Sequence, residues 1–167
     1  MLSLTAIAVI SSLGLSNRLV PLVALTGLVA AIYLTHVELT QTEAVCGAVG
    51  NCNVVQQSAY ARLFGRVPVG VVGVIGYVAM VLIWILSCVQ NRSLANAARI
   101  SLLLLALSGT VFSIYLTFLE PFVIGATCAW CLTSALTMIL LLWLAAPDGW
   151  KAIRETLDRP SVTARSA

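Results

Sequence analysis

The amino-acid sequence predicts an all-α membrane protein, a bundle of four transmembrane helices with a short interfacial helix in the first outer loop. Of the 167 residues, 60% are hydrophobic and only 9% are charged, and the mean hydropathy is +1.04. A soluble domain usually carries about 25% charged residues, so the membrane is the expected solvent. The net charge of +3 is small and scattered, which gives no indication of nucleic-acid binding.

Four long apolar segments are the predicted membrane spans, and none of them contains Asp, Glu, Lys or Arg. Each is close to the roughly 20 residues that a helix needs to cross the hydrocarbon. In lipid the backbone must satisfy its own hydrogen bonds, and these segments are too long and too evenly apolar for barrel strands. They are therefore predicted to be helices. The segments are residues 19–37, 67–89, 100–119 and 126–146.

Two flanking segments lie outside this predicted membrane domain of residues 19–146. Residues 1–18 are apolar but short for a span, and they lack the basic region and cleavage site of a signal peptide. We expect a cytoplasmic or interfacial helix there, or an extension of the first span. Residues 147–167 are polar, and we expect a partly disordered cytoplasmic tail.

The distribution of Lys and Arg predicts the orientation of the bundle. The side that carries both termini holds seven of these residues, and the other side holds two. Because cytoplasmic loops are enriched in Lys and Arg, both termini are expected in the cytoplasm, and loops 38–66 and 120–127 are expected outside. The seven are Arg18, Arg92, Arg99, Lys151, Arg154, Arg159 and Arg165, and the two are Arg62 and Arg66.

Four of the five cysteines fall on the predicted outer side, where disulfides form and persist. Cys128 and Cys131 form a C-x-x-C motif at the start of the fourth span, and a helix N-terminus favours the reactive thiolate. Cys46 and Cys52 flank a loop rich in glycine and small residues, which suits a shuttle that exchanges disulfides with a partner. A four-thiolate zinc site or purely structural disulfides also fit four cysteines, but the oxidising compartment and the spacing favour redox chemistry. Cys88, at the inner end of the second span, is expected to be a small packing residue.

The chain also contains a partial internal repeat. Gly27 matches Gly109, and the segment Ile-Tyr-Leu-Thr at 32–35 recurs at 114–117, 82 residues later. Shared leucines in two apolar helices arise by chance, but an identical tetrapeptide followed by an aligned Glu and an aligned Cys indicates a real repeat. Because the repeat relates the first span to the third, these two spans are expected to leave the membrane on the same side. The aligned pairs are Glu38 with Glu120 and Cys46 with Cys128.

The polar residues around the spans are expected at the membrane surface. An amphipathic helix capped by Asn53 and running to about residue 64 is predicted to roof the bundle, with Gln56, Gln57 and Arg62 facing water. Glu38 and Glu120 are expected in water just past the helix ends. His36, the only histidine, is expected to be an interfacial residue. Tyr33, Tyr115 and Trp130 fit an aromatic belt as well as a substrate pocket.

Taken together, these motifs resemble the bacterial vitamin K epoxide reductase family, over about residues 19–146. Each motif alone is weak, but the combination is specific. The matching elements are Cys46 and Cys52, Asn53-Val54-Val55 leading to Ser58, Phe64-Gly65-Arg66-Val67-Pro68, Ile114-Tyr115-Leu116-Thr117 and Cys128-Ala129-Trp130-Cys131.

The resemblance implies a four-helix bundle around a quinone, menaquinone or ubiquinone, which accepts electrons. It implies that Cys46 exchanges with a thioredoxin-like partner, that Cys52 exchanges with Cys128, and that Cys131 lies nearest the quinone. Ser58 matches a loop serine that supports the redox site of the family. Because no thioredoxin-like domain follows the fourth span, the partner is expected to be a separate, DsbA-like protein.

The expected function is therefore a disulfide-generating quinone reductase of the bacterial inner membrane, with its active cysteines on the periplasmic side. Reduction of vitamin K epoxide as the main role is an alternative within the family. The B-type disulfide-forming proteins are less similar, because their C-x-x-C is usually in the first outer loop. A small transporter with structural disulfides is a different class, and the uncharged spans argue against it. The animal enzymes have a quinone-contacting tyrosine where this chain has Ala135.

Overall fold

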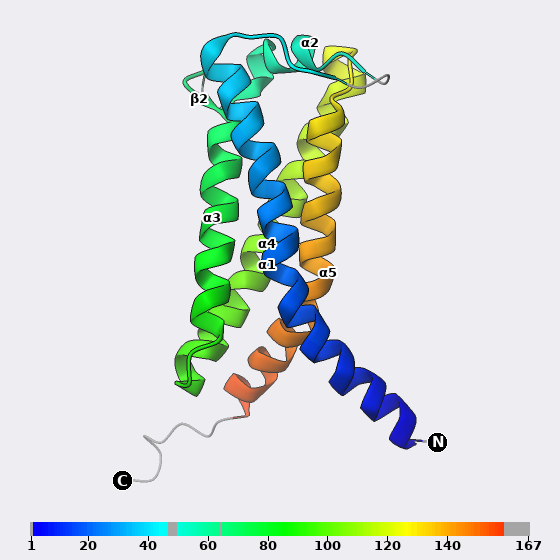
Figure 1. Ribbon diagram of the computed structural model, residues 1–167, viewed down its shortest axis with the longest axis vertical. Helices are drawn as coiled ribbons and strands as arrows, with labels where there is room; N and C mark the ends of the chain where they lie inside the picture. The colour runs from blue at the N-terminus through cyan, green and yellow to red at the C-terminus, as the bar shows by residue number, and fades with distance from the viewer. Residues whose placement is uncertain (1, 47–49, 64, 159–167) are drawn as a thin grey trace.

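The computed structural model describes residues 2–46, 50–63 and 65–158 and shows a bundle of long helices (Figure 1). Within those ranges, four helices are long and apolar enough to cross a membrane. The predicted all-α membrane fold is thus confirmed, and the chain is a multi-pass membrane protein. The four helices are α1 (Leu2–Thr40), α3 (Val69–Ser87), α4 (Arg92–Leu119) and α5 (Ala129–Leu157).

Three of these helices extend beyond the apolar segments. α1 begins at Leu2, so the first residues continue the helix of the first span. α4 begins at Arg92 because the Asn91 side chain accepts hydrogen bonds from two backbone N–H groups of the first turn. α5 runs through Pro147 to Leu157, so the first part of the expected tail is helical, and residues 159–167 of that tail lie outside the described ranges.

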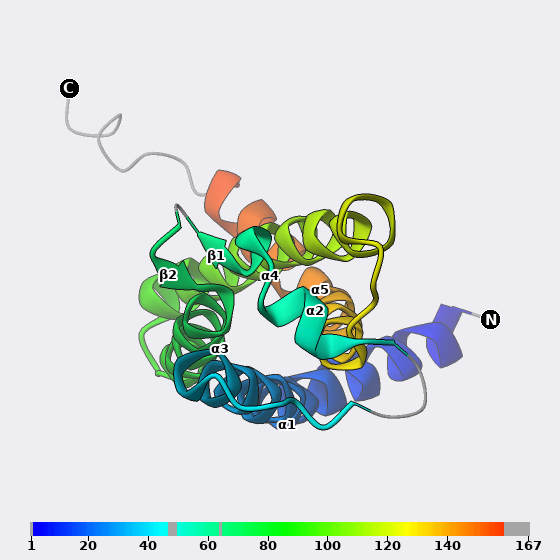
Figure 2. The same cartoon turned by 90° about the horizontal axis from the view of Figure 1, so that it is seen from above.

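The long helices pack as a ring in the order α1, α3, α4, α5 (Figures 1 and 2). Lipid is as apolar as the helix surfaces, so close packing of small residues contributes much of the helix association. Accordingly, many buried positions are alanines, and many large apolar side chains are exposed on the outside of the bundle, as expected for a surface in contact with lipid. The buried alanines of the long helices include Ala24, Ala31, Ala106, Ala145 and Ala152.

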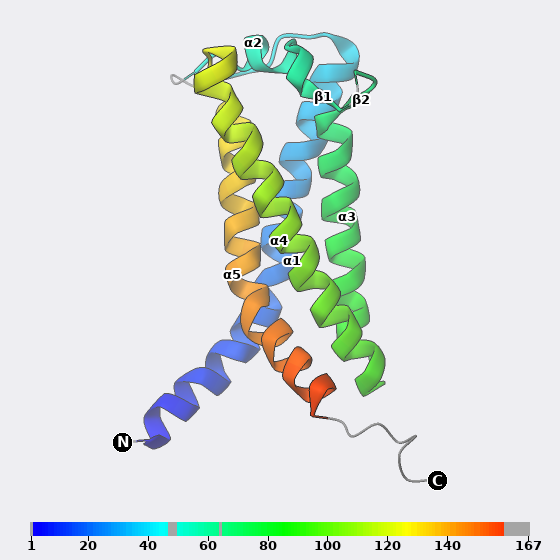
Figure 3. The same cartoon turned by 180° about the vertical axis from the view of Figure 1, so that it is seen from behind.

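Both described ends of the chain lie at one end of the bundle, and the segments that carry Cys46, Cys52, Cys128 and Cys131 lie at the other (Figures 1 and 3). This arrangement puts the ends of α1 and α4 on the same side, as the internal repeat implies. Viewed from that end, the short helix α2 (Cys52–Gln56) lies across the middle of the ring (Figure 2).

The predicted roof helix is real but shorter than expected. Asn51, and not Asn53, caps it, and it ends at Gln56. The Ser58 hydroxyl donates a hydrogen bond to the carbonyl of Val55 at 2.7 Å, which gives the last turn a competing partner. A 3-10 turn and a two-stranded antiparallel hairpin follow, formed by η1 (Ala59–Ala61), β1 (Arg62–Leu63) and β2 (Val67–Pro68).

A π-helical turn, η2 (Glu120–Ile124), continues α4 at the cysteine end. Gly125 ends it with φ of 73°, a left-handed conformation that favours glycine. The Ala126 N–H then donates to the Glu120 carbonyl at 3.1 Å. The turn therefore folds the chain back towards the start of α5, where the C-x-x-C motif lies.

Gly27 is required by the close approach of α1 and α3. A Cβ atom at this position overlaps the ring of Tyr77, which is fully buried, whereas a Cβ atom at Gly76 meets no atom within 4 Å. We therefore expect Gly27→Ala to destabilise the protein by about 1–3 kcal/mol, the usual cost of overpacking. Thermal unfolding in detergent measures the effect, with Gly76→Ala as the matched control. Equal melting temperatures for the two variants would contradict this account of the helix contact.

Candidate active site

The first cysteine pair lies in the loop that joins α1 to α2. Cys46 and Cys52 form a disulfide. Cys52 is the first residue of α2 and is completely buried, whereas Cys46 is partly exposed. The Asn51 side chain accepts a hydrogen bond from the Val54 N–H, which fixes the start of α2 and with it the position of Cys52.

Two aromatic residues hold the chain just before Cys46. The Val45 N–H donates to the Tyr33 hydroxyl at 2.8 Å, and the Trp130 indole N–H donates to the Val45 carbonyl at 2.9 Å. The two rings contact each other, with centroids 4.6 Å apart. Neither ring lines the cavity described below, so their observed role is to attach the loop to α1 and α5.

The second cysteine pair lies at the start of α5, and both of its thiols are free. Cys128 caps the helix, and its sulfur accepts a hydrogen bond from the Cys131 N–H at 3.4 Å. Hydrogen bonds from the Cys131 side chain and backbone, with a smaller one from Gln56, lower the pKa of the Cys128 thiol to about 7 against the opposing effect of burial. Cys128 therefore has substantial thiolate character near neutral pH.

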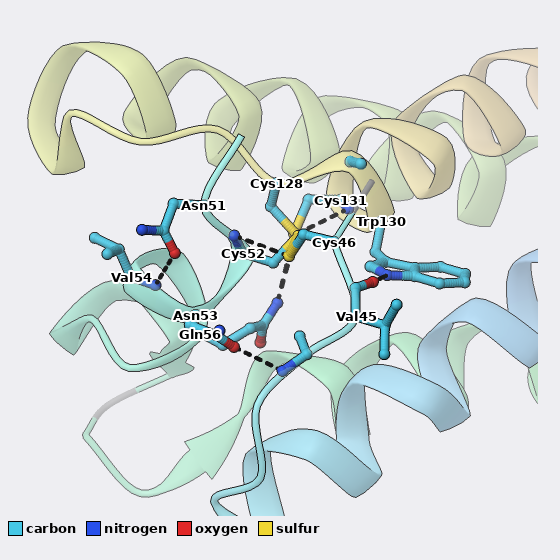
Figure 4. The surroundings of a disulfide bond; sticks show 12 residues. Val45, Cys46, Asn51, Cys52, Asn53, Val54, Gln56, Cys128, Trp130 and Cys131 are labelled. Carbon is cyan, nitrogen blue, oxygen red and sulfur yellow. Dashed lines mark hydrogen bonds between the residues drawn. A yellow bond between two sulfur atoms is a disulfide. The ribbon is translucent and has the colours of Figure 1, made fainter. Parts of the chain in front are cut away.

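The structure brings the four predicted cysteines into one cluster (Figure 4). The Asn51 N–H donates to the carbonyl of Thr127, next to Cys128, at 3.0 Å. The two buried sulfurs, those of Cys52 and Cys128, belong to the same packed group of side chains. A disulfide and a dithiol held side by side in this way have the arrangement needed for thiol–disulfide exchange.

Gln56 is an unpredicted member of the cluster. It was expected to face water, but only 9% of it is exposed, because α2 lies across the bundle and not beside it. Its side-chain amide donates to the sulfurs of Cys128 and Cys131, at 3.8 and 3.7 Å (Figure 4). Glutamine and glutamate are polar enough to be expected at a surface, so the sequence gives little signal for such a buried donor.

A mainly apolar cavity of about 340 Å³ lies next to the cysteine cluster. Side chains of all four long helices and of the segment after α2 line it, and Cys131 is the one cysteine on its wall. Its volume is within the range of small-molecule pockets, which combine apolar walls with a few polar groups. The cavity therefore offers a lipid-soluble molecule direct access to the Cys131 sulfur.

Polar groups on the cavity wall include two that the sequence did not single out. The hydroxyls of Tyr77 and Ser134 share a hydrogen bond of 2.9 Å across the bundle. The sequence feature that could have identified this pair is a tyrosine in the middle of an otherwise apolar span, because a buried tyrosine hydroxyl needs a hydrogen-bond partner. Ser58, which the family motif singled out, also lines the cavity. Ala135 is buried in α5 and does not line it.

Glu38 and Glu120 are buried, which corrects the expectation that they lie in water. Their exposed fractions are 8% and 3%, and both line the cavity. Each carboxylate accepts a backbone N–H at the start of the next long helix, from Gly70 at 3.1 Å and from Cys128 at 2.8 Å. Since helix N-termini leave N–H groups without partners, these bonds offset part of the cost of burial. The sequence feature that could have predicted their equivalent positions is the alignment of the two glutamates in the internal repeat.

His36 and Cys88 lie apart from the site. His36 is exposed near the end of α1, in agreement with an interfacial position. Cys88, expected to be a small packing residue, is an exposed free thiol whose S–H donates to the Trp84 carbonyl at 3.5 Å.

Fold and site together define a multi-pass membrane protein with a disulfide and a dithiol beside an apolar cavity. A family model described as the vitamin K epoxide reductase family matches residues 18–146. The match covers most of the chain, and the protein belongs to this family. No curated protein matches the chain. The family consists of oxidoreductases that in general use quinones as electron partners, so the protein is a redox enzyme at this level of description.

The hydrogen bonds around Cys128 predict how its reactivity depends on pH. Alkylation of Cys128 should increase with pH around a midpoint of about 7, because only the thiolate reacts. In Cys131→Ala the main stabilising hydrogen bond is lost, so the midpoint should move up towards the usual cysteine value of about 8.5. Gln56→Leu should move it up by less.

Mass spectrometry of the Cys128 peptide after brief iodoacetamide treatment at a series of pH values measures these midpoints. The measurement separates Cys128 from the other thiols of the chain. An unchanged midpoint in Cys131→Ala would show that the C-x-x-C geometry does not control the thiolate.

Proposed function

We propose that the protein is a quinone reductase that reoxidises a thioredoxin-like partner and so drives disulfide formation in exported proteins. The observation that carries this proposal is the position of Cys131. Its sulfur belongs to the cysteine cluster on one side and lines the apolar cavity on the other. Electrons that reach the second pair therefore arrive at the wall of a pocket suited to a lipid-soluble acceptor.

Burial supports an order for the electron path. Cys46 is the more exposed sulfur of the first pair, so a dithiol partner outside the membrane reaches it first. Cys52 is buried beside Cys128, which suits exchange within the protein. Each exchange breaks one S–S bond and forms another, and the two electrons move from the partner to Cys46/Cys52 and then to Cys128/Cys131.

The last step of this path is the oxidation of the second cysteine pair by the quinone. The first pair is a disulfide, ready to accept electrons, and the second pair is a dithiol, ready to donate them. When Cys128 and Cys131 form their disulfide, two S–H bonds break and one S–S bond forms. The electron pair and two protons pass to the quinone, which becomes a hydroquinone.

The cellular setting follows from the charge distribution. In the sequence, seven of the nine Lys and Arg residues fall on the side of the spans predicted to carry both termini. The proposed enzyme therefore lies in the bacterial inner membrane with both termini in the cytoplasm and its cysteines on the periplasmic side. A separate DsbA-like protein is the proposed donor, and menaquinone or ubiquinone is the proposed acceptor.

Single cysteine variants test the path. With purified protein in detergent and a reduced thioredoxin-like donor, Cys128→Ala and Cys131→Ala should lower quinone reduction about a hundredfold or more, because the dithiol no longer forms a disulfide. Cys46→Ala and Cys52→Ala should recover in part when a small dithiol replaces the protein donor. Absorbance of the quinone follows the reaction, and full activity in Cys131→Ala would refute the proposed path.

The cavity makes a separate prediction about the acceptor. Gly76 lines the cavity, and a side chain built there extends into open space. Gly76→Leu should therefore raise the KM for the quinone about tenfold or more by occupying its site, with thiol–disulfide exchange unchanged. Val78→Leu, on the lipid-exposed face of the same helix, is the control. An unchanged KM in Gly76→Leu would place the quinone elsewhere.

A further inference from the structure

Glu120 has an unused hydrogen-bonding atom at the wall of the cavity. One carboxylate oxygen accepts the Cys128 N–H at 2.8 Å, and the other has no partner although it is fully buried. A buried polar atom without a partner costs free energy unless another group or a ligand satisfies it. The cavity that Glu120 shares with Cys131 is the space from which such a ligand comes.

The local fold holds this carboxyl against the second cysteine pair. Glu120 begins the π-helical turn η2, and its carbonyl accepts the Ala126 N–H at 3.1 Å. The side chain thus bonds to the N–H of Cys128, and Glu120 and Cys131 line the same cavity. A π-helical turn at such a position is often found at functional sites.

The proposed reaction needs a proton carrier at this point. Two thiol protons must leave when the Cys128–Cys131 disulfide forms, and the quinone oxygens must gain two. Cys128 is only 1% exposed and Cys131 is only partly exposed, so bulk water has limited access to this transfer. A carboxyl that is bonded to the backbone of the second cysteine pair and shares the cavity wall with Cys131 is placed to carry a proton between the thiol and the acceptor.

We propose that Glu120 is a catalytic residue that takes the proton of the Cys131 thiol and delivers it to an oxygen of the quinone in the cavity. This inference rests on the proposed quinone reductase function. The proton leaves the sulfur as its electron pair goes towards the acceptor, and the carboxyl is returned to its starting state when it gives the proton up. Gln56, which donates to both sulfurs, holds them in place during the transfer.

Glu38 provides a matched control within the same cavity. It is also buried, lines the same wall and accepts a backbone N–H, but its interactions are with Gly70 and Arg62 and not with a cysteine. The remaining titratable groups on the wall are Tyr60 and Tyr77, and the Tyr77 hydroxyl is bonded to Ser134. A general effect of removing a buried carboxyl should therefore appear in both glutamate variants. The loss of proton transfer from the thiol should appear only in Glu120→Gln.

The first test follows one turnover of pre-reduced protein with a soluble short-chain quinone. Glu120→Gln keeps an oxygen that accepts the Cys128 N–H but cannot carry a proton. It should slow the reaction at saturating quinone by about a hundredfold or more and should increase the solvent deuterium isotope effect. Glu38→Gln should leave the isotope effect at its wild-type value, whether or not quinone binding changes. Exchange of the cysteine pairs with a small dithiol, measured by alkylation, should be unchanged in both variants.

Slowing of both variants to the same extent, or equal slowing of dithiol exchange and quinone reduction in Glu120→Gln, would overturn the assignment. If the wild-type protein reduces no quinone at all, the proposed function itself fails. The two failures are therefore distinguishable in the same set of reactions.

A second test needs no quinone. Infrared difference spectra are recorded as a chemical oxidant converts the Cys128/Cys131 dithiol to the disulfide. A carboxyl C=O signal should change in wild type and in Glu38→Gln and should be missing in Glu120→Gln. Identical carboxyl signals in all three proteins would show that Glu120 does not exchange a proton with the thiols.

Discussion

The contact between the first loop and the start of α5 is the constraint on which the redox site depends. It consists of the hydrogen bond from the Asn51 N–H to the Thr127 carbonyl at 3.0 Å and of the packing of Gly50 on Thr127. Gly50 has φ of 93°, and a Cβ atom there overlaps the Thr127 carbonyl. Cys52 follows Asn51 and Cys128 follows Thr127, so this one contact puts two distant cysteines side by side.

Much of the fold was predictable because the membrane imposes simple rules on a sequence. Apolar length defines the spans and Lys and Arg predict their direction, while the spacing of Cys128 and Cys131 predicts a reactive pair. Helix ends were less predictable, since they depend on caps. Asn51 and Asn53 are both good capping residues, and only tertiary contacts decide between them, because the Asn53 side chain is occupied by the Ala44 N–H.

The polar part of the site was the least predictable. Glu38, Gln56 and Glu120 are types of residue that normally lie in water, and nothing in a single sequence says that a loop will cover them. Their burial follows from the tertiary position of α2 over the ring and from backbone N–H groups at the starts of α3 and α5. The internal repeat hinted at this arrangement, because both halves use a glutamate at the end of one helix to bind the start of the next.

The burial of Cys52 and Cys128 has a consequence for the selectivity of electron transfer. The middle of the cysteine cluster is covered by α2, Trp130 and the turn before α5, so a folded protein does not reach it directly. In the proposed electron path, the two central sulfurs are therefore enclosed, and reaction partners meet only the two outer ones, Cys46 in the first loop and Cys131 at the cavity wall. Under that proposal, the enclosure of the central sulfurs would limit exchange with thiols of unrelated proteins.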